Sequence, residues 1–238
     1  MATVPDSAGQ LGEVRRRVAA VHGPADLQQR LRFYDGWAAE YEQDVAALQY
    51  QAPRFAASCL AAVFQGPPED ALVLDVACGT GLVAVELQAK GFCRLHGLDG
   101  SPGMLERAHH KGLYQELKQC RLGQEDLPVP EGSYDAVLTV GALGVGQVPA
   151  QVVPMLLQAT KAGGFLCLTT RTNLSNLEYK AELDRLLAEL ERRGECEKVL
   201  VQEVDKWERA TSAEEAVQDL DYIPGVVYVY RKSPGPVL

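Results

Sequence analysis

The stretch Asp75-Val76-Ala77-Cys78-Gly79-Thr80-Gly81 follows the apolar run Leu72–Val76 and leads straight into residues with helical spacing. Glycines allow the backbone to turn sharply and allow a ligand to lie against the main chain. The helix that follows such a turn offers unpaired backbone N–H groups at its first residues. The stretch therefore predicts a strand, a glycine turn and a helix, with a ligand bound at the turn.

Two carboxylates frame this turn. Asp75 lies just before Gly79, where its side chain can hold the ammonium group of an amino-acid ligand. Asp99 ends the next predicted strand, about twenty residues after the glycines, where an acidic side chain can accept both hydroxyls of a ribose. Asp75 could be only a strand-end cap and Asp99 only a turn residue. Together with the glycines, however, they favour a ligand that combines a nucleoside with an amino acid.

Beyond residue 70, short apolar runs alternate with segments of helical length. The predicted strands are Leu72–Val76, Arg94–Leu98, Leu117–Leu122, Ala136–Val140 and Phe165–Thr169. This alternation is typical of right-handed crossovers, which place parallel strands in one sheet with helices on both faces. A helix is predicted over Asn173–Arg193, and the runs Val199–Val204 and Val226–Tyr230 predict an antiparallel pair at one edge. The fold class is therefore α/β, doubly wound and mostly parallel.

The N-terminal part has a different pattern. Residues 1–25 mix glycine, proline, serine and charge without a firm period, which predicts a flexible or loosely helical segment. Apolar residues then recur at spacings of three and four from the expected N-cap Asp26 to Leu48, which predicts an amphipathic helix that Gly36 weakens. A second helix is expected over Pro53–Phe64.

The 238 residues, 47% of them hydrophobic, can bury one substantial core. We expect a single domain over residues 26–238, with N-terminal helices over 26–66 and the doubly wound core over 70–238. The longest apolar stretch, Phe55–Phe64, is much shorter than the roughly 20 residues that a membrane-spanning helix needs, so no membrane role is expected.

Charge and cysteine content narrow the function classes. A net charge of −9 repels phosphate backbones and anionic lipids, and the basic cluster Arg15–Arg17 is typical of a solvated helix face, which argues against a nucleic-acid partner. The six cysteines contain no Cys-x-x-Cys pair, so we expect reduced thiols and no metal site. These features predict a soluble protein of a reducing compartment, the cytoplasm or the nucleus.

Four motifs in this order resemble the class I S-adenosylmethionine-dependent methyltransferases. They are DVACGTG at 75–81, LDGSPGML at 98–105, EDLPVPEGSYDAV at 125–137 and KAGG at 161–164. The resemblance covers roughly residues 30–172, and four motifs at these spacings are more specific than any one of them. It implies a Rossmann-like seven-stranded sheet with a reversed C-terminal hairpin. It also implies methyl transfer from S-adenosyl-L-methionine, with S-adenosyl-L-homocysteine as the product.

The resemblance also implies roles for individual residues. Asp75, Gly79 and Gly81 would hold the methionine end of the cofactor, Asp99 the ribose and Met104 the adenine face. Gly123 stands where many relatives have an aspartate that binds adenine, so the main chain around Gly123 and Gln124 is expected to replace it. The complete set of predicted cofactor-binding residues is Trp37, Tyr41, Asp75, Ala77, Gly79, Gly81, Asp99, Gly100, Met104, Gly123, Gln124, Val140 and Gly141.

Aromatic residues at intervals of four, Phe33, Trp37 and Tyr41, share one face of the first predicted helix. They could pack this helix on the domain, or form a lid whose rings meet the sulfonium cation and exclude water. Packing is favoured for Phe33, and both readings stay open for Trp37 and Tyr41. The sequence thus predicts N-terminal lid helices.

No catalytic residue is predicted, because methyl transfer requires mainly alignment of donor and acceptor. Gly144 stands where many relatives have a histidine, and Arg171, Thr172, Asn173 and Tyr179 could contact the acceptor or form a solvated loop. A small-molecule acceptor is favoured over a protein side chain. Two alternatives stay open. One is a cofactor-binding module without turnover, and the other is an NAD-dependent oxidoreductase, since Gly79, Gly81 and Ala84 also fit a dinucleotide fingerprint.

Overall fold

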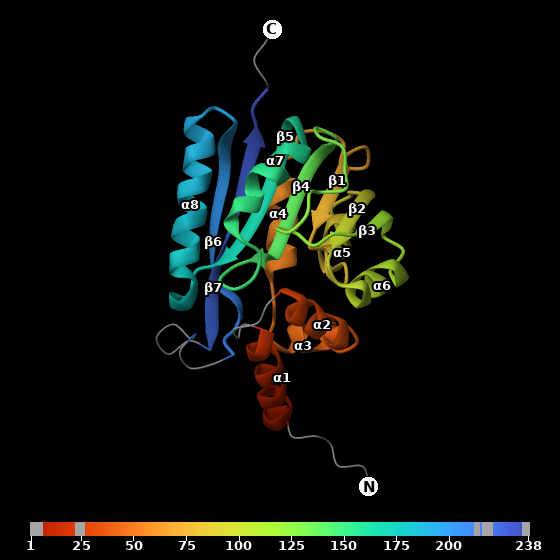
Figure 1. Cartoon of the computed structure of the whole chain (residues 1–238), viewed down its shortest axis with the longest axis vertical. Helices are drawn as coiled ribbons and strands as arrows, with labels where there is room; N and C mark the ends of the chain where they lie inside the picture. Colours follow the sequence, from red (N-terminus) through yellow and green to blue (C-terminus); the bar gives the residue numbers. More distant parts are fainter. Residues whose placement is uncertain (1–6, 22–26, 212–214, 216–220, 235–238) are drawn as a thin grey trace.

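A seven-stranded sheet lies at the centre of the molecule, with the strand order β3-β2-β1-β4-β5-β7-β6 (Figure 1). The computed structural model describes residues 7–21, 27–211, 215 and 221–234. Its strands are β1 Leu72–Val76, β2 Arg94–Asp99, β3 Tyr114–Gln119, β4 Tyr134–Leu143, β5 Thr160–Arg171, β6 Cys196–Arg209 and β7 Tyr222–Lys232.

Strand directions agree with the predicted fold class. The pairs β1–β2, β1–β4, β2–β3 and β4–β5 are parallel, and β7 is antiparallel to both β5 and β6. The prediction of a mostly parallel sheet with an antiparallel C-terminal hairpin is therefore confirmed. The carboxyl ends of the parallel strands consequently meet at one edge of the sheet, next to the N-terminal helices (Figure 1).

Strand β3 is the clearest difference from the prediction. It runs over Tyr114–Gln119 instead of Leu117–Leu122, and its pairing with β2 begins at Leu95 opposite Tyr114. This strand is at the edge of the sheet and is only half-buried, with the polar sequence YQELKQ. An apolar run does not mark such a strand, because edge strands do not need two buried faces.

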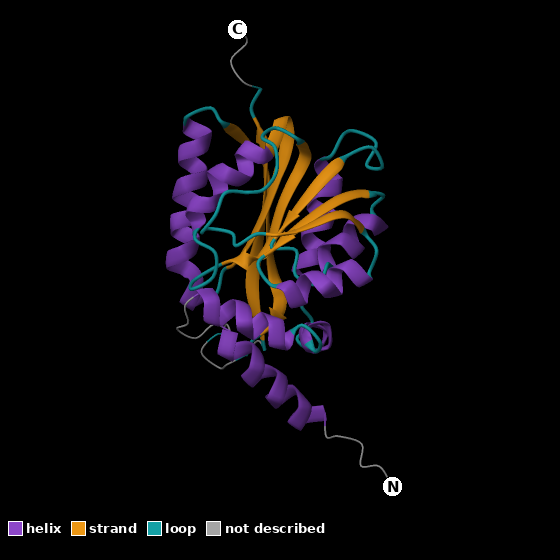
Figure 2. Ribbon diagram, turned by 45° about the vertical axis from the view of Figure 1, so that its right-hand side comes forward, coloured by secondary structure: helices purple, strands orange, loops and turns teal. Residues whose placement is uncertain are grey.

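Side chains of β1 alternate between two apolar layers, as expected for a strand. Leu74 and Val76 belong to a buried cluster with residues of α7 (Val153–Ala159) and α8 (Leu177–Arg192). Val73 belongs to another cluster with residues of α4 (Ala52–Val63) and α5 (Leu82–Ala89). Helices therefore cover both faces of the sheet, which makes it doubly wound (Figure 2).

Two further helices were predicted close to their observed bounds. The expected helix from Pro53 corresponds to α4, in which Pro53 lies in the first turn. The expected helix from Asn173 corresponds to α8, which begins only at Leu177 after a short 3-10 turn over Leu174–Asn176. The remaining elements of the core are α6, Pro102–His110, and a second 3-10 turn, Ala150–Val152.

Part of the segment predicted to be flexible forms a helix, α1, over Ser7–Val21. Val14 and Val18, one turn apart, are buried, and Arg17 makes an ion pair of 2.8 Å with Asp44. The helix agrees with the loosely helical alternative for this stretch. Its packing was not evident from the sequence, because two valines are too few to give a period among so many small and charged residues. Residues 1–6 and 22–25 of the predicted segment lie outside the described residues.

The single helix expected up to Leu48 is two helices, α2 over Leu27–Trp37 and α3 over Tyr41–Ala47. The chain turns after Gly36 and Trp37, where the amide of Glu40 donates to the carbonyl of Trp37 at 3.0 Å. The expected N-cap, Asp26, lies outside the described residues. Both helices lie against the carboxyl ends of the parallel strands (Figure 1). The division into N-terminal helices and core as parts of one domain stays a prediction.

Candidate functional site

The glycine turn after β1 has a left-handed backbone at three positions. The φ angles of Ala77, Gly79 and Gly81 are 60°, 55° and 88°. Gly81 is the N-cap of α5, and a Cβ there would lie 3.1 Å from the ring of Tyr114. A side chain at Gly81 would therefore be strained both by its backbone angle and by this contact. Ala77 accepts such an angle although it has a Cβ, which is typical of strain kept at a functional site.

Asp99 joins this turn to the next strand. Its Oδ2 accepts a hydrogen bond from the backbone N–H of Gly79 at 2.8 Å, and its Oδ1 accepts one from the N–H of Ser101 at 2.9 Å. Burial raises the pKa of Asp99, and these two N–H groups oppose that rise. Each carboxylate oxygen has a further lone pair, so Asp99 can still accept hydroxyl groups of a ligand.

Asp75 is buried behind the turn, with a side chain that is only 1% exposed. The hydroxyl of Tyr114 donates to its Oδ2 at 2.7 Å, whereas its Oδ1 has no hydrogen-bond partner among the described residues. Burial raises the pKa of Asp75 to about 7, and the nearby carboxylate of Asp99 adds to this rise. A buried acceptor without a donor is costly, so this oxygen fits a cationic group of a ligand bound at the turn.

A cleft opens beside these carboxylates, and we call it the cofactor cleft because most of the residues predicted from the sequence to bind the cofactor line it. Its lining residues are Arg30, Leu31, Tyr34, Tyr41, Ala77, Gly79, Asp99, Gly100, Met104, Cys120, Arg121, Leu122, Val140, Gly141, Ala142 and Gln147. The structure brings these predicted site residues together there: Tyr41, Ala77, Gly79, Asp99, Gly100, Met104, Val140 and Gly141. Asp75 and Gly81 lie behind the turn and do not line the cleft.

Gly123 and Gln124 do not line the cofactor cleft, although the sequence predicts their main chain as the adenine contact. Residues 120–122 line it instead. The displacement follows from β3, which ends earlier than predicted and therefore leaves Cys120 at the strand tip. Gly123 forms a turn beyond this tip, with a φ of 88° and with Pro149 3.1 Å from the position of a Cβ.

Trp37 lies outside the cofactor cleft as well. Its indole is buried among the N-terminal helices, and its Nε1 donates to Asp44 Oδ2 at 2.8 Å. Of the two readings, the structure therefore shows packing for Trp37, as it does for Phe33 in the same cluster. Tyr41 faces the cleft, and its ring centroid lies 4.8 Å from that of Trp37.

Several lining residues were not predicted as site residues. Leu31 and Tyr34 belong to the helical stripe that the sequence shows before Leu48, so their common face was a usable signal. Arg30 and Gln147 gave no such signal, since one lies beside this stripe and the other lies in the loop after β4.

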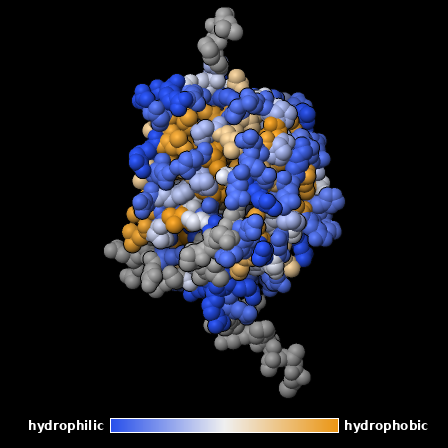
Figure 3. Space-filling view, in the orientation of Figure 1, coloured by the Kyte–Doolittle hydropathy of each residue, from blue (hydrophilic) through white to orange (hydrophobic). Residues whose placement is uncertain are grey.

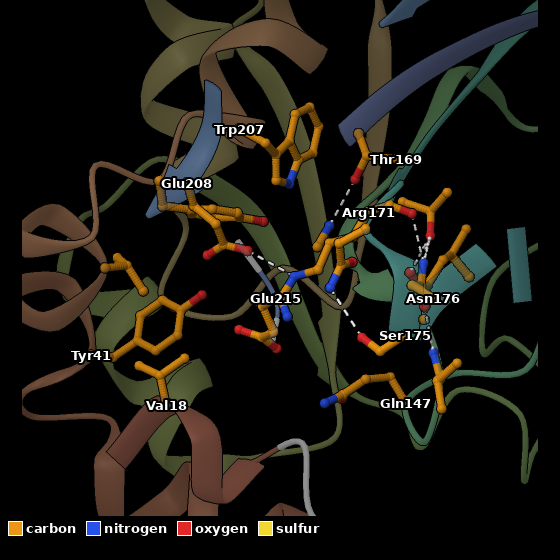
Figure 4. A pocket seen from close by; sticks show the side chains of 18 of the residues that line it. Val18, Tyr41, Gln147, Thr169, Arg171, Ser175, Asn176, Trp207, Glu208 and Glu215 are labelled. Carbon is orange, nitrogen blue, oxygen red and sulfur yellow. Dashed lines mark hydrogen bonds and ion pairs between the residues drawn. The ribbon is translucent and has the colours of Figure 1, made fainter. Parts of the chain in front are cut away.

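A second cavity of about 160 Å³ adjoins the cofactor cleft (Figure 4). Its lining residues are Val18, Tyr34, Tyr41, Val45, Tyr50, Gly141, Leu143, Gly144, Val145, Gln147, Thr169, Thr170, Arg171, Asn173, Ser175, Asn176, Trp207, Glu208 and Glu215. Tyr34, Tyr41, Gly141 and Gln147 line both spaces. A ligand in the cofactor cleft would therefore lie directly next to a molecule in the second cavity.

The tip of β5 supplies the polar wall of the second cavity. Arg171 Nε lies 2.7 Å from Glu208 Oε1, and both side chains are largely buried. Asn176 donates from Nδ2 to the carbonyl of Arg171 at 2.7 Å and accepts at Oδ1 from the Val145 amide at 2.9 Å, which fixes the surrounding loops. The wall is therefore an ordered arrangement of polar groups.

The four acceptor candidates after β5 separate into two pairs. Arg171 and Asn173 line the second cavity, as does Gly144. The amide of Thr172 donates to the carbonyl of Pro224, and the hydroxyl of Tyr179 donates to the carbonyl of Val148 at 2.7 Å. Thr172 and Tyr179 therefore support the fold and do not line the cavity.

Hydrophilic side chains cover much of the face of the molecule drawn in Figure 3, with smaller apolar areas between them. Within residues 7–21, 27–211, 215 and 221–234, no helix is long and apolar enough to cross a membrane. The same residues contain no group of three or more His, Cys, Asp or Glu side chains that could hold a metal ion.

Comparisons with known proteins agree with this geometry. Residues 73–164 match the family model described as "Methyltransferase domain". Human methyltransferase-like protein 27 is 59% identical over 201 residues, which cover 84% of this chain and 82% of that protein.

Solved structures show the same fold at low sequence identity. A methyltransferase of Haloferax volcanii, described as putative and solved in complex with the Trm112 methyltransferase activator, has a TM-score of 0.61 and 16% identity. That match covers 84% of this chain and 96% of the other. An S-adenosylmethionine-dependent methyltransferase of Thermotoga maritima has a TM-score of 0.56 and 18% identity, over 84% of this chain and 98% of the other.

These matches exclude the reading as an NAD-dependent oxidoreductase and bear out the resemblance of the four motifs. The buried oxygen of Asp75 that lacks a donor, the second carboxylate at Asp99 and the turn at Gly79 fit S-adenosyl-L-methionine as the cofactor. The chain therefore belongs to the S-adenosylmethionine-dependent methyltransferases, in the same family as human methyltransferase-like protein 27.

Proposed function

We propose that this enzyme methylates a small molecule, and that the acceptor binds in the second cavity. The observation that carries the proposal is the shared boundary of the two spaces at Tyr34, Tyr41, Gly141 and Gln147. An acceptor on one side of this boundary can approach a methyl donor on the other side directly. A cavity of about 160 Å³ suits a compact molecule better than a large polymer.

The site residues of the proposal have distinct tasks. Asp99 accepts hydrogen bonds from the ribose hydroxyls, and Asp75 balances the charge of the ammonium group from behind the turn. Met104 and Leu31, both at the cofactor cleft, pack on the base. Ala77 and Gly79, the turn residues that line the cleft, allow the ligand to lie against the main chain.

Bound S-adenosyl-L-methionine supplies an activated methyl group on its sulfonium, so the protein mainly has to align the acceptor and exclude water. Effective molarity from alignment can account for roughly 7 to 11 kcal/mol of the barrier. Tyr34 and Tyr41 line both spaces at their boundary and keep bulk water from the reacting atoms. Burial raises the pKa of Tyr34 to about 12, so this phenol stays neutral at physiological pH.

The experiment is methyl transfer from cofactor carrying a labelled methyl group into a whole-cell extract. The purified chain is incubated with the extract, and molecules are then separated by size. We expect label in the small-molecule fraction, and expect its transfer to fall when Tyr41→Ala removes the shared wall. Label that appears only in protein, or no transfer while the cofactor binds tightly, would contradict the proposal.

We also propose a cellular compartment and binding partners for the enzyme. We place the enzyme in the cytoplasm or the nucleus, which is consistent with six cysteines that are all free. A small-molecule acceptor remains the favoured partner, with a protein side chain as the alternative. Nucleic acid and membranes are disfavoured by the net charge of −9.

A further inference from the structure

The charged groups of the second cavity carry more negative than positive charge. Among the described lining residues, Arg171 is the cation, and Glu208 and Glu215 are the anions. One positive and two negative charges leave a formal charge of −1. Figure 4 shows Arg171 extending toward Glu208, with Glu215 and Tyr41 nearby. Such a site attracts a cation or a molecule that donates hydrogen bonds more strongly than it attracts an anion.

Polar atoms in this wall also need donors. Asn173 is 2% exposed, its Nδ2 donates to Ser175 Oγ at 3.0 Å, and its Oδ1 has no hydrogen-bond partner among the described residues. Glu208 is 4% exposed, and its carboxylate makes an ion pair with Arg171. Both groups accept hydrogen bonds, so a ligand that brings N–H groups would satisfy them.

Three tyrosines complete the cavity as neutral aromatic surfaces. Burial raises the pKa of Tyr41 and of Tyr50, as it does that of Tyr34, so none of the three phenols is an anion at physiological pH. Their rings can contact a cationic head, because a desolvated cation over an aromatic face is stabilised. The carboxylates of Glu208 and Glu215 are then the described lining groups that can accept a proton.

The two carboxylates differ in position. Glu208 is on β6, directly after Trp207, and its charge acts on both Tyr41 and Tyr50. Tyr41 lines the boundary with the cofactor cleft. Glu215 accepts hydrogen bonds from the hydroxyl and the amide of Thr211. Glu208 is therefore the carboxylate that an ion pair with Arg171 holds in the cavity wall, whereas Oε2 of Glu215 already accepts two hydrogen bonds from Thr211.

We propose that the acceptor is a compact amine and that Glu208 is its proton acceptor, an inference that rests on the small-molecule function proposed above. The amine enters as an ammonium ion and transfers one proton to the Glu208 carboxylate. The freed nitrogen lone pair forms a bond to the methyl carbon, and the C–S electron pair returns to sulfur. The products are a methylated ammonium ion and S-adenosyl-L-homocysteine, and Glu208 later releases its proton to water.

Burial raises the pKa of Glu208, and the Arg171 guanidinium opposes that rise. A carboxylate with a raised pKa holds a proton more readily than one in water, which suits a group that deprotonates an ammonium. Arg171 keeps the carboxylate charged and oriented until the amine arrives.

The test uses the full chain and S-adenosyl-L-methionine with a trideuterated methyl group. A deproteinised cell extract is separated on a cation exchanger into retained molecules, which include amines, and flow-through molecules. We expect label in an N-methylated product of the retained fraction. Label in O-, S- or C-methylated products, or only in the flow-through, would contradict the proposal that the acceptor is an amine. It would still agree with the proposal that the enzyme methylates a small molecule. Absence of label from both fractions would overturn both proposals.

A variant series tests Glu208. We expect Glu208→Gln to lower the turnover of the labelled amine at least about 100-fold, with cofactor affinity within twofold of the wild type. Asp205→Asn on the same strand, an exposed site outside the cavity, should leave turnover unchanged. Because Glu208→Gln leaves Arg171 buried without its partner, the double variant Arg171→Met with Glu208→Gln provides a second protein for the same assay. Full amine turnover by either folded variant would overturn the role of Glu208.

Discussion

Asp35 on α2 and Ser101 at the start of α6 are hydrogen-bonded to each other, and this contact joins the N-terminal helices to the cofactor cleft. Asp35 Oδ1 accepts from the Ser101 hydroxyl and also from the Gly103 amide at 3.0 Å. Ser101 in turn donates its own amide to Asp99, the predicted ribose ligand. Hydrogen bonds through Ser101 therefore connect α2 to Asp99.

Loss of this contact should weaken the attachment of α2 to the cofactor cleft. Asp35→Ala removes a charged acceptor of two hydrogen bonds, and we expect the dissociation constant for S-adenosyl-L-methionine to rise about 5- to 30-fold, which corresponds to about 1–2 kcal/mol. Isothermal titration calorimetry measures it. Arg32→Ala, at an exposed site on the same helix, is the control and should bind as the wild type does. Unchanged affinity in Asp35→Ala would show that α2 does not contribute to cofactor binding.

Cofactor affinity should depend on pH through Asp75. Its pKa is about 7 without ligand, and a bound ammonium stabilises the charged form, so binding lowers this pKa and releases a proton. Affinity should therefore be highest above pH 7 and decrease as the pH falls below 7, by at most about tenfold per pH unit. Titrations between pH 5.5 and about 8.5 measure this trend, with Asp75→Asn as the variant that should lack it. Exposed Asp70→Asn should retain the full dependence.

The same residue predicts the opposite trend for the stability of the cofactor-free protein. In the unfolded chain the pKa of an aspartate is about 3.9, below its value of about 7 in the fold. Asp75 thus stabilises the folded state most below pH 4, and this contribution is lost as the pH rises toward 7. The difference between the wild type and Asp75→Asn in thermal midpoint should change with pH over this window. A constant difference would contradict the raised pKa.

Two glycines both have a left-handed backbone but differ in the space around them. Alanine substitutions at the two positions therefore form a matched pair of variants. Gly141 has a φ of 76°, and a Cβ there would collide with the Tyr50 hydroxyl at the boundary of the two cavities. Gly163 has a φ of 77°, and a Cβ there would meet nothing within 4 Å. Gly163→Ala should cost only the backbone strain of about 1–2 kcal/mol, whereas Gly141→Ala should cost more and should also reduce methyl transfer.

Thermal unfolding with and without cofactor measures the stability of both variants, and the labelled-methyl assay measures transfer. One kcal/mol corresponds to about 2–4 °C in the midpoint for a chain of this size. Suppose that the two variants have equal thermal midpoints and that Gly141→Ala transfers methyl groups as the wild type does. The Tyr50 side chain would then be free to move away from Gly141 and would not define the boundary between the two cavities.

Trp37 should matter for stability more than for the cofactor. Trp37→Phe keeps a ring but removes the N–H that donates to the buried Asp44, whose remaining partner is Arg17. Loss of this hydrogen bond to a buried carboxylate should lower the free energy of unfolding by about 1–3 kcal/mol. Chemical denaturation measures this loss, and calorimetry should find cofactor affinity within about twofold of the wild type, a change well below 1.4 kcal/mol. A large loss of affinity with unchanged stability would restore the lid role for this indole.

Local motifs explain which parts of the site the sequence could predict. Asp75, Gly79 and Asp99 lie in or next to the turns after β1 and β2, where strand ends and glycines mark the chemistry directly. Strand β3 has no such motif, because its edge sequence is polar. Gly123 and Gln124, which were predicted from the expected end of this strand, consequently lie beyond the residues that line the cleft.

The second cavity could be predicted only in part. Arg171, Asn173 and Gly144 were considered for the acceptor side and line it, but its other walls come from distant parts of the chain. Glu208 on β6 meets Arg171 on β5, and Tyr41 joins the same wall from the N-terminal helices. The amide of Arg209 donates to the carbonyl of Leu48 at 2.7 Å, so the pairing of β6 with the segment after α3 decides this arrangement. No local residue spacing in the sequence predicts such a contact between β6 and the segment after α3.

Calorimetric titration of S-adenosyl-L-methionine into Asp99→Asn and Asp75→Asn tests the central claim most directly, namely that carboxylates at two adjacent strand tips hold the cofactor. The account predicts a dissociation constant about 10- to 100-fold higher for each variant. The exposed Asp70→Asn should bind as tightly as the wild type. Wild-type affinity in both folded site variants would contradict the account.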